Sequence, residues 1–99
     1  MSGILGVYAF DRVWNVGKFL YYGLIGLQHR GYSHSGIVTL GNEGFTAVID
    51  KAAPEDLEIN GLRGWAGVGY TGTRPGYPLV TDYGVAVVDG VVRNVEELL

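Results

Sequence analysis

Glycine is the residue that most constrains how this chain can fold. The 99 residues include 17 glycines, which separate short apolar runs instead of forming one tract; average usage is only ~7%. Because glycine has no Cβ, this spacing predicts tight turns or places where backbones pack closely. Hydrophobic residues make up 47% of the chain and charged residues 17%, which excludes a disordered segment. We therefore expect a single folded domain over residues 1–99.

The first part of the chain predicts a strand followed by a helix. Residues 4–10 form a continuous apolar run, which favours a strand that is buried on both faces. Apolar residues recur at helical spacing over 16–29, so this segment is expected to be a helix. Gly23 and Gly26 weaken its intrinsic propensity, and both are explained if the helix lies close against a sheet.

The rest of the chain predicts strands separated by turns. Residues 41–43 are a hairpin signal, 51–60 form a polar connection, and two prolines and a glycine exclude regular structure over 73–78. The order of strand, helix and several strands favours an α+β fold with a largely antiparallel sheet. The expected later elements are strands at 35–40, 44–50, 65–71 and 84–89, a turn at 89–90, a short strand from 91 and a helix capped by Asn94.

Charge and hydropathy exclude several classes of partner. The net charge is −3 with seven Lys and Arg, so we expect no nucleic-acid partner. The longest apolar run, 19–27, has nine residues, whereas a bilayer span needs roughly 20, so no membrane partner is expected. The N-terminus has no basic stretch before its apolar residues, and we therefore expect a cytoplasmic protein.

Cysteine-based chemistry is excluded, because the sequence contains no cysteine. His29 and His34 have no acidic residue between them and make a weak metal site, so structural roles are expected. The segment Gly67-Val68-Gly69-Tyr70-Thr71-Gly72 matches the spacing of the dinucleotide fingerprint. The prolines that follow prevent the helix that would hold a pyrophosphate, and we reject the match. We expect no cofactor and no metal.

Three segments, in this order along the chain, resemble one known family. They are Gly23-Leu24-Ile25-Gly26-Leu27-Gln28-His29-Arg30-Gly31 with Ser35-Gly36-Ile37-Val38, then Leu62-Arg63-Gly64 with Gly67-Val68-Gly69, and finally Asp89-Gly90-Val91 with Asn94 and Glu96-Glu97-Leu98. Together they resemble the N-terminal half of the glutamine amidotransferase domain (class II, N-terminal nucleophile) of the amidophosphoribosyltransferase family. The resemblance implies an N-terminal-nucleophile fold, an αββα sandwich with largely antiparallel sheets, truncated here to about half.

The same resemblance implies a degenerate site. Ser2 stands where the family has its nucleophilic cysteine, and Gly72 stands where it has the arginine that grips the glutamine carboxylate, although Arg74 is close in sequence. Asp89 replaces the asparagine that donates to the oxyanion, and its partner Gly90 is kept. An ionised Asp89 would repel the negative charge of the oxyanion. Losing one oxyanion donor raises the activation free energy by about 3–4 kcal/mol. These positions are therefore expected to be relics, without a catalytic residue.

Three functions remain open at this point. The first is a non-catalytic amidotransferase-like module, structural or regulatory, that self-associates or binds a partner subunit to cover the exposed face and edges of a half-sandwich. The second is a hydrolase or amidase in which removal of Met1 frees Ser2, whose own α-amine acts as the base. The third is a fragment that folds poorly alone. The first leads, with a homo-oligomer or a protein subunit as the expected partner and no enzyme activity.

Overall fold

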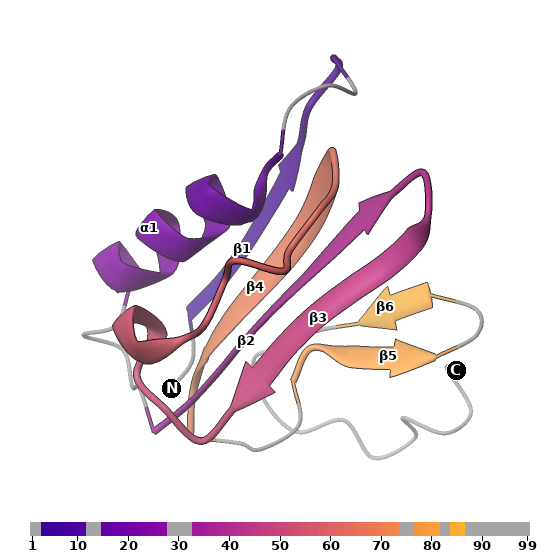
Figure 1. Ribbon diagram of the computed structural model, residues 1–99. Helices are drawn as coiled ribbons and strands as arrows, with labels where there is room; N and C mark the ends of the chain where they lie inside the picture. Colours follow the sequence, from indigo (N-terminus) through magenta and orange to yellow (C-terminus); the bar gives the residue numbers. More distant parts are fainter. Residues whose placement is uncertain (1–2, 12–14, 28–32, 74–76, 82–83, 87–99) are drawn as a thin grey trace.

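A computed structural model gives the fold of residues 3–11, 15–27, 33–73, 77–81 and 84–86, which are the residues described below. Figure 1 shows how the helix and strands are arranged. In chain order the elements are β1 (Gly3–Tyr8), α1 (Gly17–Leu27), β2 (His34–Gly41), β3 (Gly44–Asp50), the 3-10 turn η2 (Pro54–Asp56), β4 (Ala66–Gly72), β5 (Leu79–Thr81) and β6 (Gly84–Ala86).

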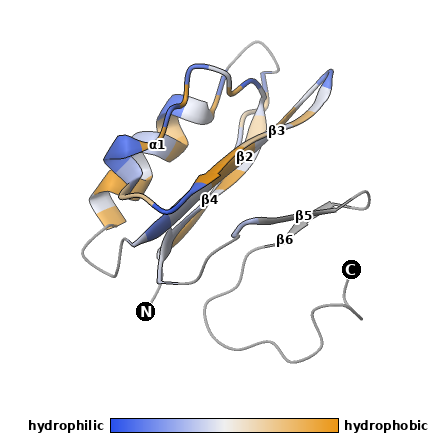
Figure 2. Ribbon diagram, turned by 60° about the horizontal axis from the view of Figure 1, so that its bottom comes forward, coloured by the Kyte–Doolittle hydropathy of each residue, from blue (hydrophilic) through white to orange (hydrophobic). Residues whose placement is uncertain are grey.

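Four of the strands form one antiparallel sheet in the order β1-β4-β2-β3, so the described strands β1 and β3 are its edges. Helix α1 covers one face of this sheet, and the two-stranded antiparallel sheet β5–β6 lies on the side away from α1 (Figures 1 and 2). The chain is therefore a small α+β domain, as the order of its sequence patterns predicts.

The core lies between α1 and the sheet. Leu20 and Leu24 on α1 are fully buried against Ile37 of β2, and burying each such side chain contributes about 1.5–3 kcal/mol. Figure 2 shows hydrophobic residues along the strands and on the helix. The other buried members of this cluster are Val16, Leu57 and Leu62.

Two glycines of β4 let the helix approach the sheet. A Cβ placed on Gly67 would lie 2.7 Å from Leu20 Cδ1, and one on Gly69 would lie 3.0 Å from Leu24 Cδ1. Both glycines belong to the segment that matches the dinucleotide fingerprint, and this segment is the strand β4 and not the start of a helix. The glycine spacing is thus explained by helix–sheet packing.

The prediction that Gly23 and Gly26 both let α1 lie close to the sheet is confirmed for Gly23 and wrong for Gly26. A Cβ on Gly23 would collide with the Leu5 side chain of β1, so close approach to the sheet is confirmed there. Gly26 has nothing within 4 Å of such a Cβ, so the same explanation is wrong for Gly26.

The prediction that the first strand is buried on both faces is wrong. β1 ends at Tyr8, and its side chains alternate between half-buried and exposed. Only one face lies against α1, so Ile4 remains 39% exposed and Tyr8 58% exposed, while Phe10, beyond the strand, is 95% exposed. A continuous apolar run therefore does not mean two covered faces here.

The strands expected at 35–40, 44–50 and 65–71 are confirmed as β2, β3 and β4 to within a residue at each end. The strand expected at 84–89 is confirmed over β6, and β5 was not predicted. The expected turn at 89–90, strand from 91 and helix at Asn94 lie outside the described residues.

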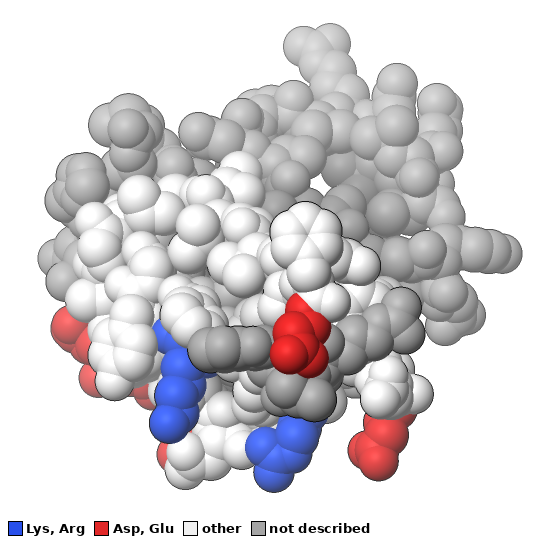
Figure 3. Space-filling model, turned by 90° about the horizontal axis from the view of Figure 1, so that it is seen from above, with Lys and Arg blue, Asp and Glu red and all other residues white. Residues whose placement is uncertain are grey.

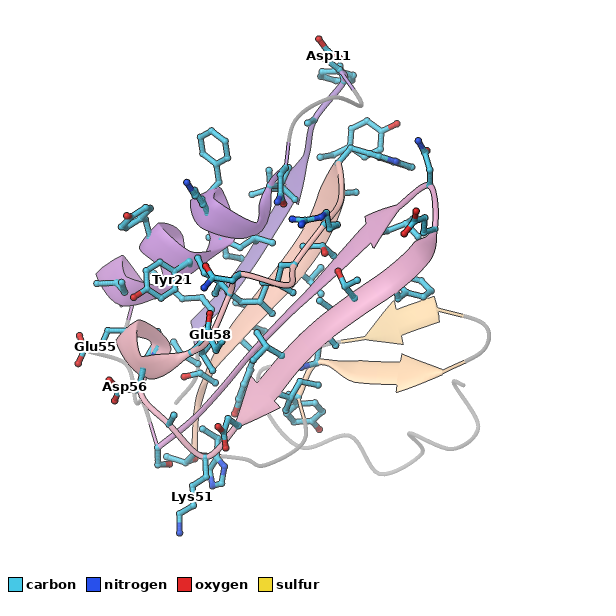
Figure 4. The ribbon with its side chains drawn as sticks, viewed as in Figure 1. Asp11, Tyr21, Lys51, Glu55, Asp56 and Glu58 are labelled. Atoms are coloured by element: carbon cyan, nitrogen blue, oxygen red, sulfur yellow. The ribbon has the colours of Figure 1, made fainter. Side chains whose placement is uncertain are left out.

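The polar connection after β3 is tied to the helix by one side-chain hydrogen bond. The Tyr21 hydroxyl donates to the carbonyl of Glu55 at 2.7 Å. Figure 4 shows Tyr21 projecting from α1 toward this connection. The bond fixes η2 over the end of the core where the Leu57 side chain is buried.

Charges on the surface are mixed in sign. Figure 3, which looks onto the molecule from the top of Figure 1, shows positive and negative side chains alternating along one rim of this face. In the described part of the chain, no helix is long and apolar enough to cross a membrane.

Candidate functional site

The first residues of β1 and β2 and the last residues of β3 and β4 meet at one end of the sheet, and we take this end as the candidate site. The antiparallel register places Gly3, the first residue of β1, opposite Thr71 of β4. It also places His34, the first residue of β2, opposite Gly72, the last residue of β4. The backbone pairing therefore places Gly3, which follows Ser2 in the sequence, next to Thr71, which precedes Gly72.

Hydroxyl groups gather at this end. The Ser35 hydroxyl donates to Thr71 Oγ1 at 3.3 Å, and both side chains are completely buried. The Ser33 hydroxyl donates to the carbonyl of Gly72 at 3.2 Å. These bonds join the start of β2 to the end of β4 on the α1 face, and they hold the strand ends together with uncharged groups.

Gly3 is required at its position for steric reasons. A Cβ on Gly3 would lie 2.9 Å from Leu27 Cβ and 3.2 Å from Thr71 Cγ2. The last turn of α1 therefore rests directly on the backbone of β1 at this end. Any side chain at position 3 would push the helix away from the strand, because packed interiors have no spare volume.

Only one of the predicted site residues is described. Gly72 is buried at the end of β4, with its carbonyl bonded to Ser33, and glycine has no side chain that could grip a carboxylate. Ser2, Arg74, Asp89 and Gly90 lie outside the described residues. The catalytic assignments that the resemblance implies for these four positions stay predictions.

The hydroxyl cluster of Ser33, Ser35 and Thr71 could not be predicted from the sequence. Alternation of Ser33 and Ser35 at the start of a strand was visible in the sequence. What was lacking was the β2–β4 register, which pairs Ser35 with Thr71 across 36 positions of the chain. Among the described residues, no group of three His, Asp or Glu side chains could hold a metal ion.

The sheet face opposite α1 is a second surface of interest, because it is apolar and partly open. Ile4 of β1 and Phe45 and Ile49 of β3 are 39%, 43% and 38% exposed. Tyr77 packs edge-on against Tyr70 on this face, with ring centroids 5.2 Å apart. A shallow hollow of about 190 Å³ lies on this sheet, lined by Val7, Val38, Leu40, Phe45, Ala66, Gly67 and Val68.

Fold and site together define a small α+β domain, with a helix on one side of a four-stranded antiparallel sheet and a two-stranded sheet on the other. The chain is similar to two archaeal amidophosphoribosyltransferases. That of Methanocaldococcus jannaschii is 38% identical over 74 residues, covering 71% of this chain and 16% of that protein. That of Methanothermobacter thermautotrophicus is 40% identical over 74 residues, covering 69% of this chain and 15% of that protein. No family model matches the chain.

The similarity is distant and partial. This chain spans only about one sixth of the length of the curated relatives that it matches. What it supports is likeness to a segment of amidophosphoribosyltransferase.

Proposed function

We propose that this chain is a non-catalytic glutamine amidotransferase-like module that assembles through its sheet, with itself or with a partner subunit. The single observation that carries the proposal is the exposure of apolar side chains on both edge strands of the sheet, on the face opposite α1: Ile4 on β1, and Phe45 and Ile49 on β3. Exposed apolar surface rimmed by polar residues marks interaction sites on soluble proteins. Burial of this face on another chain would release the water that now contacts it.

The proposed fold is the N-terminal-nucleophile sandwich, in which stacked antiparallel sheets lie between helix layers. Its support is the order of layers, namely α1, the four-stranded sheet and then the β5–β6 sheet on the far side. The partial similarity to amidophosphoribosyltransferases agrees with it.

The proposed absence of catalysis is supported by the groups at the site. The sequence has no cysteine, and the described serine hydroxyls at this end of the sheet donate to Thr71 or to the backbone. A serine hydroxyl is a weak nucleophile unless a base activates it. Glycine at position 72 and aspartate at position 89 further weaken carboxylate binding and oxyanion stabilisation in the proposed site.

One observation favours the alternative, a hydrolase that uses a freed Ser2. Gly3 pairs with Thr71, so the residue that follows Ser2 stands at the site. A free α-amine with a pKa near 8 could take the hydroxyl proton of Ser2. This alternative requires that Met1 be removed.

An assay of ammonia release from glutamine distinguishes the two functions. We expect the purified chain, with its N-terminal residue established by mass spectrometry, to release no ammonia above the rate in buffer. Ammonia release that is lost in Ser2→Ala would contradict the proposal and establish the alternative. Calorimetric titration with glutamine should show no binding at millimolar concentration.

A further inference from the structure

We propose that the outer edge of β3 pairs with the same edge of a second copy, antiparallel and about a twofold axis at Ala47, to make one continuous eight-stranded sheet. This inference rests on the proposed assembly function and names its surface and partner. β3 is the last strand of the sheet, and its outer edge pairs with none of the described residues. It is seven residues long, and Asp50, at its end, is its only charged residue.

The direction of the backbone groups on β3 follows from one hydrogen bond. The carbonyl of Leu40 accepts from the amide of Trp65, so the backbone groups of Leu40 point toward β4. Directions alternate along a strand, so those of Thr39 point toward β3, where its partner is Thr46. The amide and carbonyl groups of the alternate residues of β3 therefore point outward. These residues are Phe45, Ala47 and Ile49.

A twofold axis at Ala47 pairs these outward residues with one another. Ala47 meets its own copy, and Phe45 meets Ile49 of the second copy on each side. All three positions direct amide and carbonyl groups outward, so each pair exchanges two hydrogen bonds. The Phe45–Ile49 pairs lie on the apolar face, where an aromatic side chain opposite a β-branched one contributes about 0.2–1 kcal/mol.

Charge also matches in this register. Glu43 lies in the turn directly before β3 and Lys51 directly follows it, so antiparallel pairing about Ala47 brings Glu43 of each copy toward Lys51 of the other. Both side chains are exposed. Figure 4 shows Lys51 extending away from the fold. The pairing thus joins two opposite-charge pairs and sets no like charges opposite each other, because Asp50 faces Gly44.

The other open edge is less suited to self-pairing. β1 has no charged residue, and its outward-directed positions are Ile4, Gly6 and Tyr8. A twofold axis at the middle one would set Gly6 opposite Gly6. Glycine in a strand has no side chain to pack and weakens the pairing. The observations therefore favour the β3 edge and a second copy of this chain as its occupant.

Charge reversal tests the pairing. Glu43 and Lys51 are separated by the whole of β3, roughly 26 Å at ~3.3 Å per residue, so they cannot interact within one chain. Glu43→Lys and Lys51→Glu should each raise the dimer dissociation constant about tenfold in low salt, by turning attraction into repulsion at two sites. The double variant should return it to within about twofold of the original value. Sedimentation equilibrium at low and high salt measures all four constants.

A backbone variant makes the test independent of charge. Ala47→Pro removes an amide that points outward, so it removes donors from the dimer and none from the β2–β3 ladder. We expect monomers that keep the circular dichroism of the original chain. If Ala47→Pro fails to fold, the charge-reversal series still decides.

The outcomes separate this inference from the proposed function. A dimer that does not respond to either single charge reversal would overturn the β3 pairing and leave assembly through another surface intact. A monomer at all concentrations up to the solubility limit would also overturn the pairing. Ammonia release that depends on Ser2 would overturn the proposed non-catalytic function without affecting the dimer.

Discussion

Gly3 and Thr71 lie opposite each other at the end of the β1–β4 pair, and the Thr71 methyl would be 3.2 Å from a Cβ on Gly3. This one register joins the beginning of the first strand to the end of the fourth, although 68 positions separate them. It places Thr71, the residue before Gly72, beside Gly3, the residue after Ser2. The candidate site therefore follows from sheet topology before any side-chain chemistry is considered.

Replacing Gly3 should damage the packing at this end. A Gly3→Val variant would bring side-chain atoms against Leu27 and Thr71, and overpacking of this kind costs about 1–3 kcal/mol. Urea denaturation followed by circular dichroism measures the loss. A matched control is Gly26→Ala, where nothing lies within 4 Å; it should be neutral or stabilise by up to about 1 kcal/mol. Equal effects at the two positions would contradict the packing.

The glycines of β4 should behave as packing residues. Gly67→Ala would place a methyl group 2.7 Å from both Leu20 Cδ1 and the backbone carbonyl oxygen of Val38, and should destabilise the domain by about 1–3 kcal/mol. The backbone contact cannot be relieved by a rotamer change. In contrast, Gly61→Ala meets open space and should change stability by less than about 1 kcal/mol. A neutral Gly67→Ala would show that α1 does not lie this close to β4.

Truncating the helix side of the core should produce the largest loss. Leu24 is fully buried over β4, and Leu24→Ala should cost about 2–5 kcal/mol. Tyr22, on the same helix, is 67% exposed, and Tyr22→Ala should cost less than about 1 kcal/mol. The midpoints of urea unfolding of the two variants, compared with that of the original chain, measure the two losses of stability. A larger loss from Tyr22→Ala would mean that α1 presents a different face to the sheet.

The buried hydroxyl pair should contribute modestly. Ser35→Ala removes the hydrogen bond to Thr71 and should cost about 1 kcal/mol. Ser33→Ala, which removes a bond to the Gly72 carbonyl from an exposed side chain, should cost less. Thermal unfolding of the two variants beside the original chain measures both. If Ser35→Ala stabilises the domain, the free-energy cost of burying the hydroxyl is larger than the stabilisation from its hydrogen bond.

The element order could be predicted because it depends on local patterns. The helical spacing of Leu20 and Leu24, and the turn between β2 and β3, act over a few residues and need no knowledge of the fold. Burial could not be read from the same pattern. Ile4 and Tyr8 look like core residues in the sequence, yet only one face of β1 is covered by the helix.

The candidate site was harder to predict because it is assembled from distant segments. Ser35 and Thr71 meet only through the order β1-β4-β2-β3, which local periodicity does not determine. Gly72 could be singled out from the resemblance to a known family, and the hydroxyl groups around it could not. The proposed pairing of the β3 edge could not be predicted from the sequence either, because it depends on the strand register and on where Glu43 and Lys51 lie beside that strand.

Assembly through the sheet is the claim on which the proposed function depends. The measurement that tests it is the solution mass of the purified, untagged chain, obtained by light scattering after size exclusion over a range of micromolar concentrations. We predict a discrete species of twice the chain mass, which dissociates on dilution. A single species of one chain mass at every concentration would contradict self-assembly and leave only a different subunit as the partner.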